Sequence, residues 1–381
     1  MTVQYVRVKA QSELFSPPAQ AFGNLGIAGK ATAGPFDKAT AITSPQDAKD
    51  IFQGGDLVDA IVLAFSQSPG PSLIYAVRAQ NAAAAGDWET ALTAMIVADV
   101  QIVCLANVPM TAAAVAAPGG GGAGPGGPIL QLAQHVKTVS QGTGGDGRER
   151  IGVAMLEKGA TDPVIVAGDL VTDRMVYIAH KSDADAAAAV AAVIAGYEPH
   201  VSLLLKPVAI VSDPFTPSEI LQINGNESFG TGPAGLGINW LTDPPLIPGR
   251  GIFLGEGYTA DGAPGQPKKY IDIVRTLDYI TNMLKRRLII SIGNVRISRS
   301  GLRSLVGQME AVLEPPLSAQ MIESYRVTVP ILALLDKDPA TLTAAQATAI
   351  GDAQATRRVE VLIEVDYAGA LHRLDITLKF V

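Results

Sequence analysis

The residues best suited to binding a phosphate are the glycines of one loop, residues 118–128, with the sequence PGGGGAGPGGP. The spacing G-x-G-x-x-G occurs there twice, from Gly119 and from Gly122. A dinucleotide site needs such glycines in a tight turn between a strand and a helix, because the amides of the helix bind the pyrophosphate. Here the stretch MTAAAVAA separates the strand from the glycines, and three prolines remove amides. A surface loop is favoured, and nucleotide binding by a cytosolic α/β enzyme is kept as the alternative.

The residues that carry out hydrolysis or bind metals do not combine into a recognisable site. Cys104 lies in the apolar run VQIVCLANV, which is typical of a buried side chain. Ser228 lacks the G-x-S-x-G elbow, because Asn226 replaces the first glycine. No histidine has a metal-ligand spacing to another histidine or to Cys104. The histidines are His135, His180, His200 and His372. We expect no enzyme, no cofactor and no metal.

Positive charge gathers in one segment of a chain whose net charge is −7. The basic residues of this segment are Lys285, Arg286, Arg287, Arg296, Arg299 and Arg303. They form either a solvated face or a docking surface for an acidic partner. The acidic remainder of the chain offers no general attraction to nucleic acid.

The start of the chain and its longest apolar region argue against export and membrane insertion. The first residues, MTVQYVRVKAQSELF, lack the apolar core of a signal peptide, which favours residence in a cytoplasm. The apolar region from Ala91 to Pro118 is interrupted by Asp99, Gln101 and Asn107, which a bilayer would penalise.

Elements of two periodicities alternate in the middle of the chain, residues 21–266. Helical patterns such as DLVDAIVLAFSQS and PILQLAQHVKTV alternate with apolar strand patterns such as VQIVCLANV and RIGVAMLEK. Strands that are apolar on both faces are typical of a buried sheet. The sequence predicts a sandwich-like α/β domain here.

The next segment, residues 267–356, has a different composition and predicts an α+β domain. Apolar residues repeat at helical spacing in YIDIVRTLDYITNMLKRRL. We expect a second helix that begins near Ser300 and ends at Pro315 and Pro316. The stretch DKDPATLTAAQATAIGDAQAT reads as rich in turns.

The two ends of the chain predict strands. The amino-terminal strand, in an arm of residues 1–20, is formed by Val3, Tyr5, Val6 and Val8. The carboxy-terminal segment, residues 357–381, alternates apolar and polar residues in two runs, with a reversal expected through Gly369. The apolar residues of these runs are Val359, Val361, Ile363, Val365, Leu374, Ile376, Leu378 and Phe380. A strand at the very end of a chain raises the question of what it pairs with.

Several stretches, taken in order, resemble the sheath proteins of contractile phage tails and related injection machines. The first is GIAGKATAGPFDKATAITSPQDAKDIFQGG, followed by a helix and PSLIYAVRAQ. The second is GINWLTDPPLIPGRGIFLGEGYT, the third the long helix YIDIVRTLDYITNMLKRRL, and the last the RRVEVLIEV and LDITLKF ending. Arg275 alone remains of the arginine-rich helix start that is usual in the family.

The resemblance implies a fold, a function and a set of partners. It implies that the terminal arms add strands to neighbouring subunits, so that the predicted terminal strands form inter-subunit sheets. It implies a helical homopolymer around a tail tube protein, contacts with baseplate and tail terminator proteins, and a place in the tail of a virion or an injection device. Contraction by subunit rotation without nucleotide hydrolysis would drive the tube through the target envelope. The basic residues of 285–303 would then face the tube.

Overall fold

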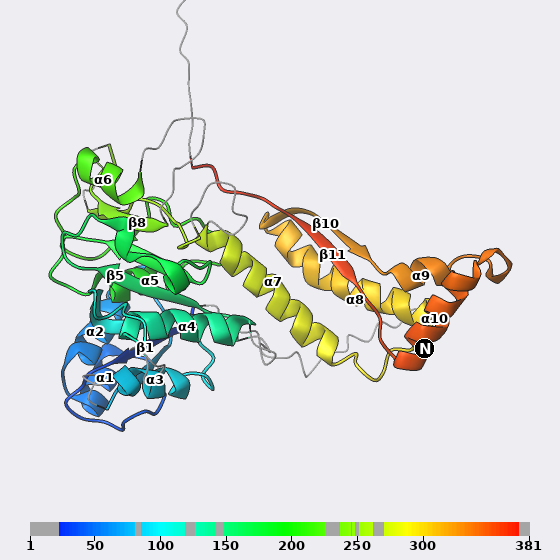
Figure 1. Ribbon diagram of the computed structural model, residues 1–381, viewed down its shortest axis with the longest axis horizontal. Helices are drawn as coiled ribbons and strands as arrows, with labels where there is room; N and C mark the ends of the chain where they lie inside the picture. Colours follow the sequence, from blue (N-terminus) through cyan, green and yellow to red (C-terminus); the bar gives the residue numbers. More distant parts are fainter. Residues whose placement is uncertain are drawn as a thin grey trace, which may run out of the picture.

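The structure is a computed structural model of the 381-residue chain, and it describes residues 23–80, 85–118, 126–141, 148–225, 237–244, 246–247, 251–261 and 270–372. The molecule is elongated, with a layered α/β part at one end and a mainly helical part at the other (Figure 1). Helix α7, Ile271–Ile289, runs between the two parts.

A sheet forms the centre of the α/β part, and in the described residues its strand order is β2-β3-β1-β4-β5-β6-β8-β9-β7. The strands are β1 Leu25–Gly29, β2 Thr40–Ile42, β3 Ile74–Arg78, β4 Ile102–Met110, β5 Ile151–Leu156, β6 Met175–Ala179, β7 Pro207–Val208, β8 Ile238–Thr242 and β9 Ile252–Leu254. The run from β3 to β8 is parallel, whereas the pairs β2–β3, β8–β9 and β9–β7 are antiparallel. All residues of β1, β5 and β6 are buried, as the apolar runs predict for a covered parallel sheet.

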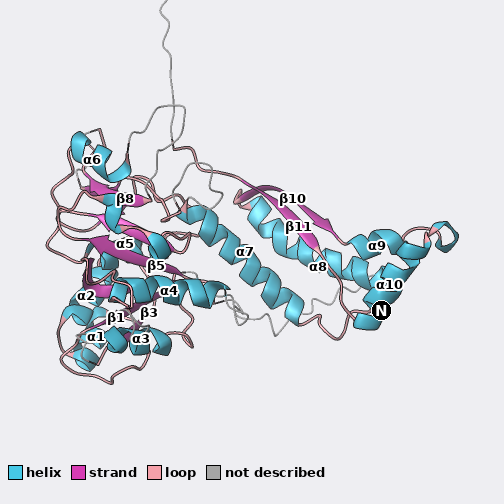
Figure 2. Ribbon diagram, viewed as in Figure 1, coloured by secondary structure: helices cyan, strands magenta, loops and turns pink. Residues whose placement is uncertain are grey.

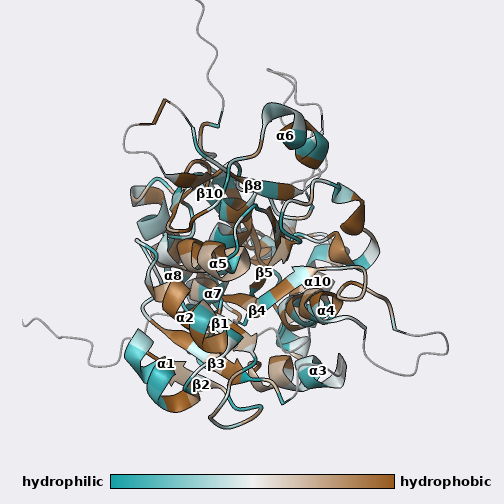
Figure 3. Cartoon of the chain, turned by 90° about the vertical axis from the view of Figure 1, so that its left-hand side faces the viewer, coloured by the Kyte–Doolittle hydropathy of each residue, from teal (hydrophilic) through white to brown (hydrophobic). Residues whose placement is uncertain are grey.

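Helices cover both faces of this sheet, and Figure 3 views this end of the molecule with helices on either side of the strands. The first face packs against α1 Pro45–Phe52, α2 Asp56–Phe65 and α5 Ala186–Gly196. The second face packs against α3 Ala85–Ala94, α4 Pro128–Gln141 and α6 Pro217–Asn224. Cys104 of β4 is fully buried in the first core, as predicted, and burial raises the pKa of its thiol.

The second part of the molecule is mainly helical, with one small sheet (Figure 2). Its elements after α7 are α8 Arg299–Ser318, β10 Ile322–Thr328, α9 Pro330–Leu335, α10 Ala344–Thr356 and β11 Leu362–Tyr367. A short 3-10 turn lies between α9 and α10, at Pro339–Thr341. Two more lie in the α/β part, between β5 and β6, at Pro163–Ile165 and Gly168–Leu170. Together the two parts give the mixed α/β and α+β architecture that the sequence predicts.

Two sequence predictions in the helical part are wrong. Helix α8 begins after the cap Ser298, not Ser300, and continues through Pro315 and Pro316. A proline removes its own donor, but the carbonyls of both prolines still accept amides, from Ala319 and Met321, and Pro316 is buried. The stretch expected to be rich in turns contains α10.

Helix α10 begins with a capping box that could have been found in the sequence. The Thr343 side chain accepts from the amide of Gln346, and the Gln346 side chain accepts from the amide of Thr343. This T-x-x-Q pattern satisfies amides at the helix start. It predicts a helix in spite of the prolines and aspartates that precede it.

Polar residues on one side of α7 are buried against the α/β part. Arg275 donates to the carbonyls of Tyr197 and Glu198, just beyond α5, at 2.9 and 3.3 Å. Asp278 accepts from Nη1 of Arg174 at 2.5 Å, and both side chains are nearly buried. Burial opposes the charge on Arg174, but the carboxylates of Asp278, Asp173 and Glu149 together raise its pKa. These buried contacts fix α7 on the sheet.

We expect Asp278→Ala to lower the free energy of unfolding by about 3–5 kcal/mol, because it leaves the buried guanidinium of Arg174 without its main carboxylate. Urea denaturation measures this loss. Glu360→Ala breaks an exposed pair with Arg358 and is the control, with an expected change of about 0–1 kcal/mol. Equal effects of the two substitutions would show that the Arg174–Asp278 pair does not hold α7 in place.

Candidate assembly interface

The six basic residues predicted to face a tube lie at the end of α7, in the turn that follows and at the start of α8. Three of them bind carboxylates of the same chain. Lys285 contacts Glu149 at 2.5 Å, and Asp336 accepts from both Arg299 and Arg303 at 3.0 and 2.9 Å. Arg286 is half-buried.

Arg287 and Arg296 remain on the surface, and both are exposed. The fold therefore divides the basic segment: Lys285 pairs with Glu149, whereas Arg299 and Arg303 share the single carboxylate of Asp336. The assignment of all six residues to a tube contact stays a prediction.

The strands β10 and β11 form an antiparallel pair, and within the described residues no third strand joins them. A two-stranded sheet needs a packed face to be stable, and here that face lies on the helices. Ile363 of β11 packs with Leu284 of α7 and with Val327 of β10. Most residues of both strands remain exposed. Both outer edges therefore carry unpaired main-chain groups of the kind that accept an added strand.

The residues predicted to exchange strands fall into three groups. Ile363 and Val365 lie in β11, which pairs with β10 of the same chain. Val359 and Val361 precede the strand and pack, with Ile363, against the helical core. The remaining residues lie outside the described part of the chain. They are Val3, Tyr5, Val6, Val8, Leu374, Ile376, Leu378 and Phe380. Exchange between subunits therefore stays a prediction.

The chain does not turn back onto β11 at Gly369 within the described residues. The segment after β11 runs to the α/β part instead, as Figure 1 shows. Tyr367 donates a hydrogen bond to Asp272 at the start of α7. His372 lies between Ser202 and Glu256, with Nε2 2.8 Å from Ser202 Oγ and Nδ1 3.2 Å from Glu256 Oε2. We call Tyr367, His372 and their partners the C-terminal anchor.

The Ser202–His372–Glu256 arrangement has the order of a hydrolase triad, but its surroundings favour a structural role. With Glu256 ionised, His372 Nδ1 donates to it, and the Ser202 hydroxyl then donates to Nε2. A hydrolase also needs amides directed at a substrate oxygen. The amide of Leu204 donates to Ser202 Oγ instead, which fixes the hydroxyl in a turn. No local pattern predicts this contact, because 116 residues separate His372 from Glu256.

We expect His372→Ala to increase amide hydrogen exchange across residues 367–372 by roughly tenfold or more, because it removes the hydrogen bonds to Ser202 and to the buried Glu256. Hydrogen exchange with mass spectrometry measures this. Leu371→Ala changes a neighbouring side chain that is 75% exposed and is expected to leave exchange unchanged. Unchanged exchange in both variants would contradict the anchor.

Packing explains the two glycines of the loop that the structure describes. A Cβ at Gly127 would lie 2.3 Å from the carbonyl oxygens of both Ala113 and Ala114, and one at Gly126 would lie 2.9 Å from that of Ala116. The first amides of α4 are already engaged, since Gly127 donates to Ala116 and Ile129 to Ala114. Pro128 has no amide, so the helix start offers little to a phosphate. The segment 119–125 lies outside the described residues.

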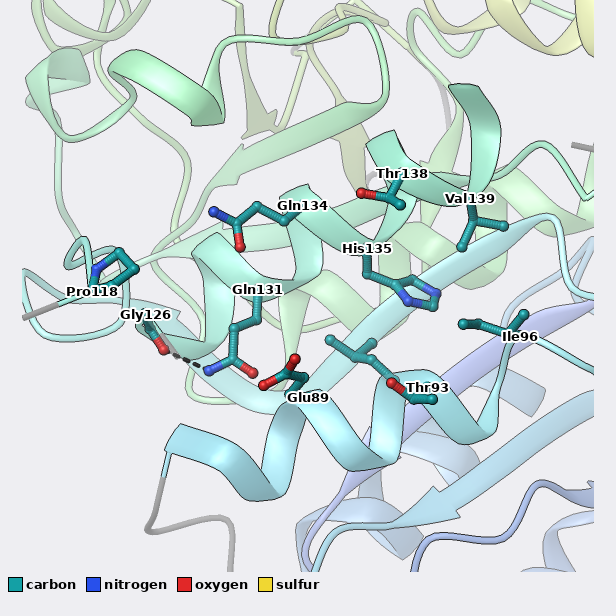
Figure 4. A pocket seen from close by; sticks show the side chains of 11 residues that line it. Glu89, Thr93, Ile96, Pro118, Gly126, Gln131, Gln134, His135, Thr138 and Val139 are labelled. Carbon is teal, nitrogen blue, oxygen red and sulfur yellow. Dashed lines mark hydrogen bonds between the residues drawn. The ribbon is translucent and has the colours of Figure 1, made fainter. Parts of the chain in front are cut away.

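A pocket of about 640 Å³ lies between α3 and α4, beside the end of this loop (Figure 4). Its size suits a small ligand, but Glu89 is the charged residue on its wall, and no lysine or arginine lines it. His135 also lines it, and burial together with Arg150 lowers its pKa to about 3. His135 is therefore neutral, and the pocket lacks the cations that a nucleotide would need. In the described residues, no cluster of His, Cys, Asp or Glu is placed to bind a metal.

We expect Gly127→Ala to lower the free energy of unfolding by about 1–3 kcal/mol, because the added methyl overlaps two carbonyls. Gly351→Ala in α10 meets no atom within 4 Å and is the control, with no loss expected. Thermal unfolding measures both.

In the same assay, ATP or NAD should leave the wild-type melting temperature unchanged. A rise with nucleotide that Gly127→Ala abolishes would instead support the nucleotide site.

No protein-family model and no curated protein matches the chain. Solved structures do match it, and they include sheath proteins. The helical sheath of the anti-feeding prophage in its contracted state has a TM-score of 0.63 and 14% identity, covering 100% of this chain and 99% of that one. A sheath tail protein from Desulfitobacterium hafniense has a TM-score of 0.58 and 10% identity, covering 86% and 92%. One from Listeria innocua has 0.55 and 8%, covering 83% and 90%.

The chain therefore has the fold of contractile tail sheath proteins. Its likeness to the anti-feeding prophage sheath extends over nearly the whole of both chains. A chain in the baseplate structure of the same system also matches, with a TM-score of 0.64. The resemblance that the sequence predicts is confirmed at the level of the fold. In the part of the chain that is described, no helix is both long and apolar enough to cross a membrane.

Proposed function

We propose that this chain is the structural subunit of a contractile sheath. Copies polymerise helically around a tail tube, and a change of lattice drives the tube through the target envelope. The observation that carries the proposal is the end-to-end match with the contracted sheath of the anti-feeding prophage. The engaged amides of α4 and the lack of cations in the adjacent pocket weigh against the enzyme alternative.

Assembly, in this proposal, uses strands that leave their own subunit. The edges of the β10–β11 pair accept strands from neighbours, supplied by the arm of residues 1–20 and by the end of the segment 357–381. The C-terminal anchor supports this, since it fixes the point from which the last residues leave the body. A contact between different surfaces does not close on itself, so it builds a helical tube.

Contraction, in this proposal, requires no nucleotide. The free energy is stored in the extended lattice, and a kinetic barrier holds it until the baseplate gives a signal. Subunits with domains at 21–266 and 267–356 rotate as rigid bodies, while strands keep neighbours joined. The buried contacts of α7 support rigid rotation. Tube, baseplate and terminator proteins are the proposed partners, and the tail of a virion or an injection device is the proposed location.

We expect the full chain to form hollow striated tubes at rising concentration, alone or with a tube protein, in negative-stain electron microscopy. A chain that ends at His372 keeps every described contact but lacks residues 373–381, and it should remain folded without forming tubes. A chain that ends before Arg357 also loses β11 and should likewise form no tubes. Circular dichroism checks that the His372 truncation is folded.

Uniform small particles from the full chain, even with tube protein added, would contradict the sheath proposal. Tubes from the His372 truncation would leave the sheath role intact but reject exchange by the last strand. The full chain therefore tests polymerisation, and the His372 truncation tests strand exchange.

A further inference from the structure

The turn between α7 and α8 presents apolar side chains to solvent. Ile289, Ile290 and Ile292 are 67%, 56% and 78% exposed. Arg287 and Arg296 flank them. We call these five residues the knob. Single exposed apolar residues are common, but three large ones in one turn mark an interaction site.

The knob is held in a fixed shape by its own hydrogen bonds. The amides of Asn294 and Val295 donate to Ser291 O at 3.1 Å, and the Asn294 side chain donates to Ile290 O at 3.1 Å. The Ser291 hydroxyl also donates to Gln308 of α8. A turn that is ordered before binding loses little entropy on binding.

A pocket on the α/β part has the complementary character. It has a volume of about 310 Å³ and lies between the start of α2 and the loop before α5. Ala60, Leu63 and Ala184 supply its apolar lining. Its polar lining consists of Asp56, Asp59, Asp183, Asp185 and Asn107. We call this pocket the socket. Because a water occupies ~30 Å³, the socket holds roughly ten waters, which is room for the ends of aliphatic side chains.

The socket is built by an irregularity in β4. The register of β4 against β5 shifts between Cys104 and Pro109, and Asn107 has a positive φ of 53°. As a result, the side-chain Nδ2 of Asn107 donates to Asp56 Oδ1 at 3.0 Å. The main-chain amide of Asn107 donates to Asp185 Oδ2 at 2.7 Å.

The negative charge of the socket is only partly balanced within the chain. Lys158 pairs with Asp183 at 2.5 Å. Burial, and to a smaller extent the charge of Asp56, raise the pKa of Asp185 to about 6 in spite of the amides that bind Asp185. Asp59 is exposed at the rim. An arriving arginine would relieve this repulsion.

We propose that the knob of one copy binds the socket of a second copy. The shapes and charges match, with isoleucines against an apolar floor and arginines against aspartates. In Figure 1, α4 lies between α2 and the end of α7, so one chain cannot make the contact with itself. A knob and a socket on different surfaces give a head-to-tail contact, which generates an open polymer. The inference rests on the proposed function, and it assigns Arg287 and Arg296 to a neighbour rather than to the tube.

Disulfide trapping between two single variants tests the contact. Ile292→Cys and Asp59→Cys are mixed under conditions that give polymers and are oxidised, so any new bridge joins different copies. The native Cys104 is fully buried and gives little background. The control mixture pairs Ile292→Cys with Val211→Cys. Val211 is 90% exposed and is not part of the socket. We expect dimers to form at least tenfold faster in the first mixture, and more slowly at high salt.

Polymers that cross-link no faster than the control would overturn the contact and leave the sheath role intact. Protection of Ile292→Cys from alkylation only when tube protein is present would also overturn it, and would assign the knob to the tube. A mixture that gives neither polymers nor cross-links would reject both the contact and the sheath role. Asp59→Arg and Arg287→Asp give an independent readout, since each should reduce polymer yield and their combination in one chain should restore it.

Discussion

The arrangement of this molecule depends on α7, an amphipathic helix that buries charged residues against the α/β part. A buried charge is costly unless it has a partner, and the three on α7 each have one. Asp278 pairs with Arg174, Arg275 donates to the carbonyls beyond α5, and Asp272 accepts from Tyr367. These polar contacts have fixed directions, unlike apolar packing, so they fix the angle at which α7 leaves the α/β part. The positions of α8, of the β10–β11 pair and of the knob all follow from that angle.

The surfaces that suggest assembly are those the single chain leaves incomplete. Two strands with open edges are weakly stable by themselves, and the helices beneath them supply the missing support. The C-terminal anchor holds His372 against Ser202 and Glu256 of the α/β part.

Two parts of the molecule resemble binding or active sites, but their hydrogen-bonding groups already have partners within the chain. Gly127 completes a nucleotide fingerprint by spacing, yet the backbone carbonyls of Ala113 and Ala114 pass too close to it for any side chain. Ser202, His372 and Glu256 match a hydrolase triad by geometry, yet the nearest amide binds the serine itself. In both cases the hydrogen-bonding groups that a substrate would need are bound within the chain.

Local patterns in the sequence predict most of the elements and the resemblance to sheath proteins. Periodicity identifies the buried strands and the long α7, because burial on one or both faces leaves a local pattern. It predicts helix α8 but not its ends, since Pro316 is buried and the carbonyls of both prolines accept later amides, and it misses α10, whose start carries a capping box. Tertiary contacts establish which basic residues pair with carboxylates, where His372 is bound and how the socket forms. Those contacts join residues far apart in the chain, such as Lys285 with Glu149, and such pairings have no local signature.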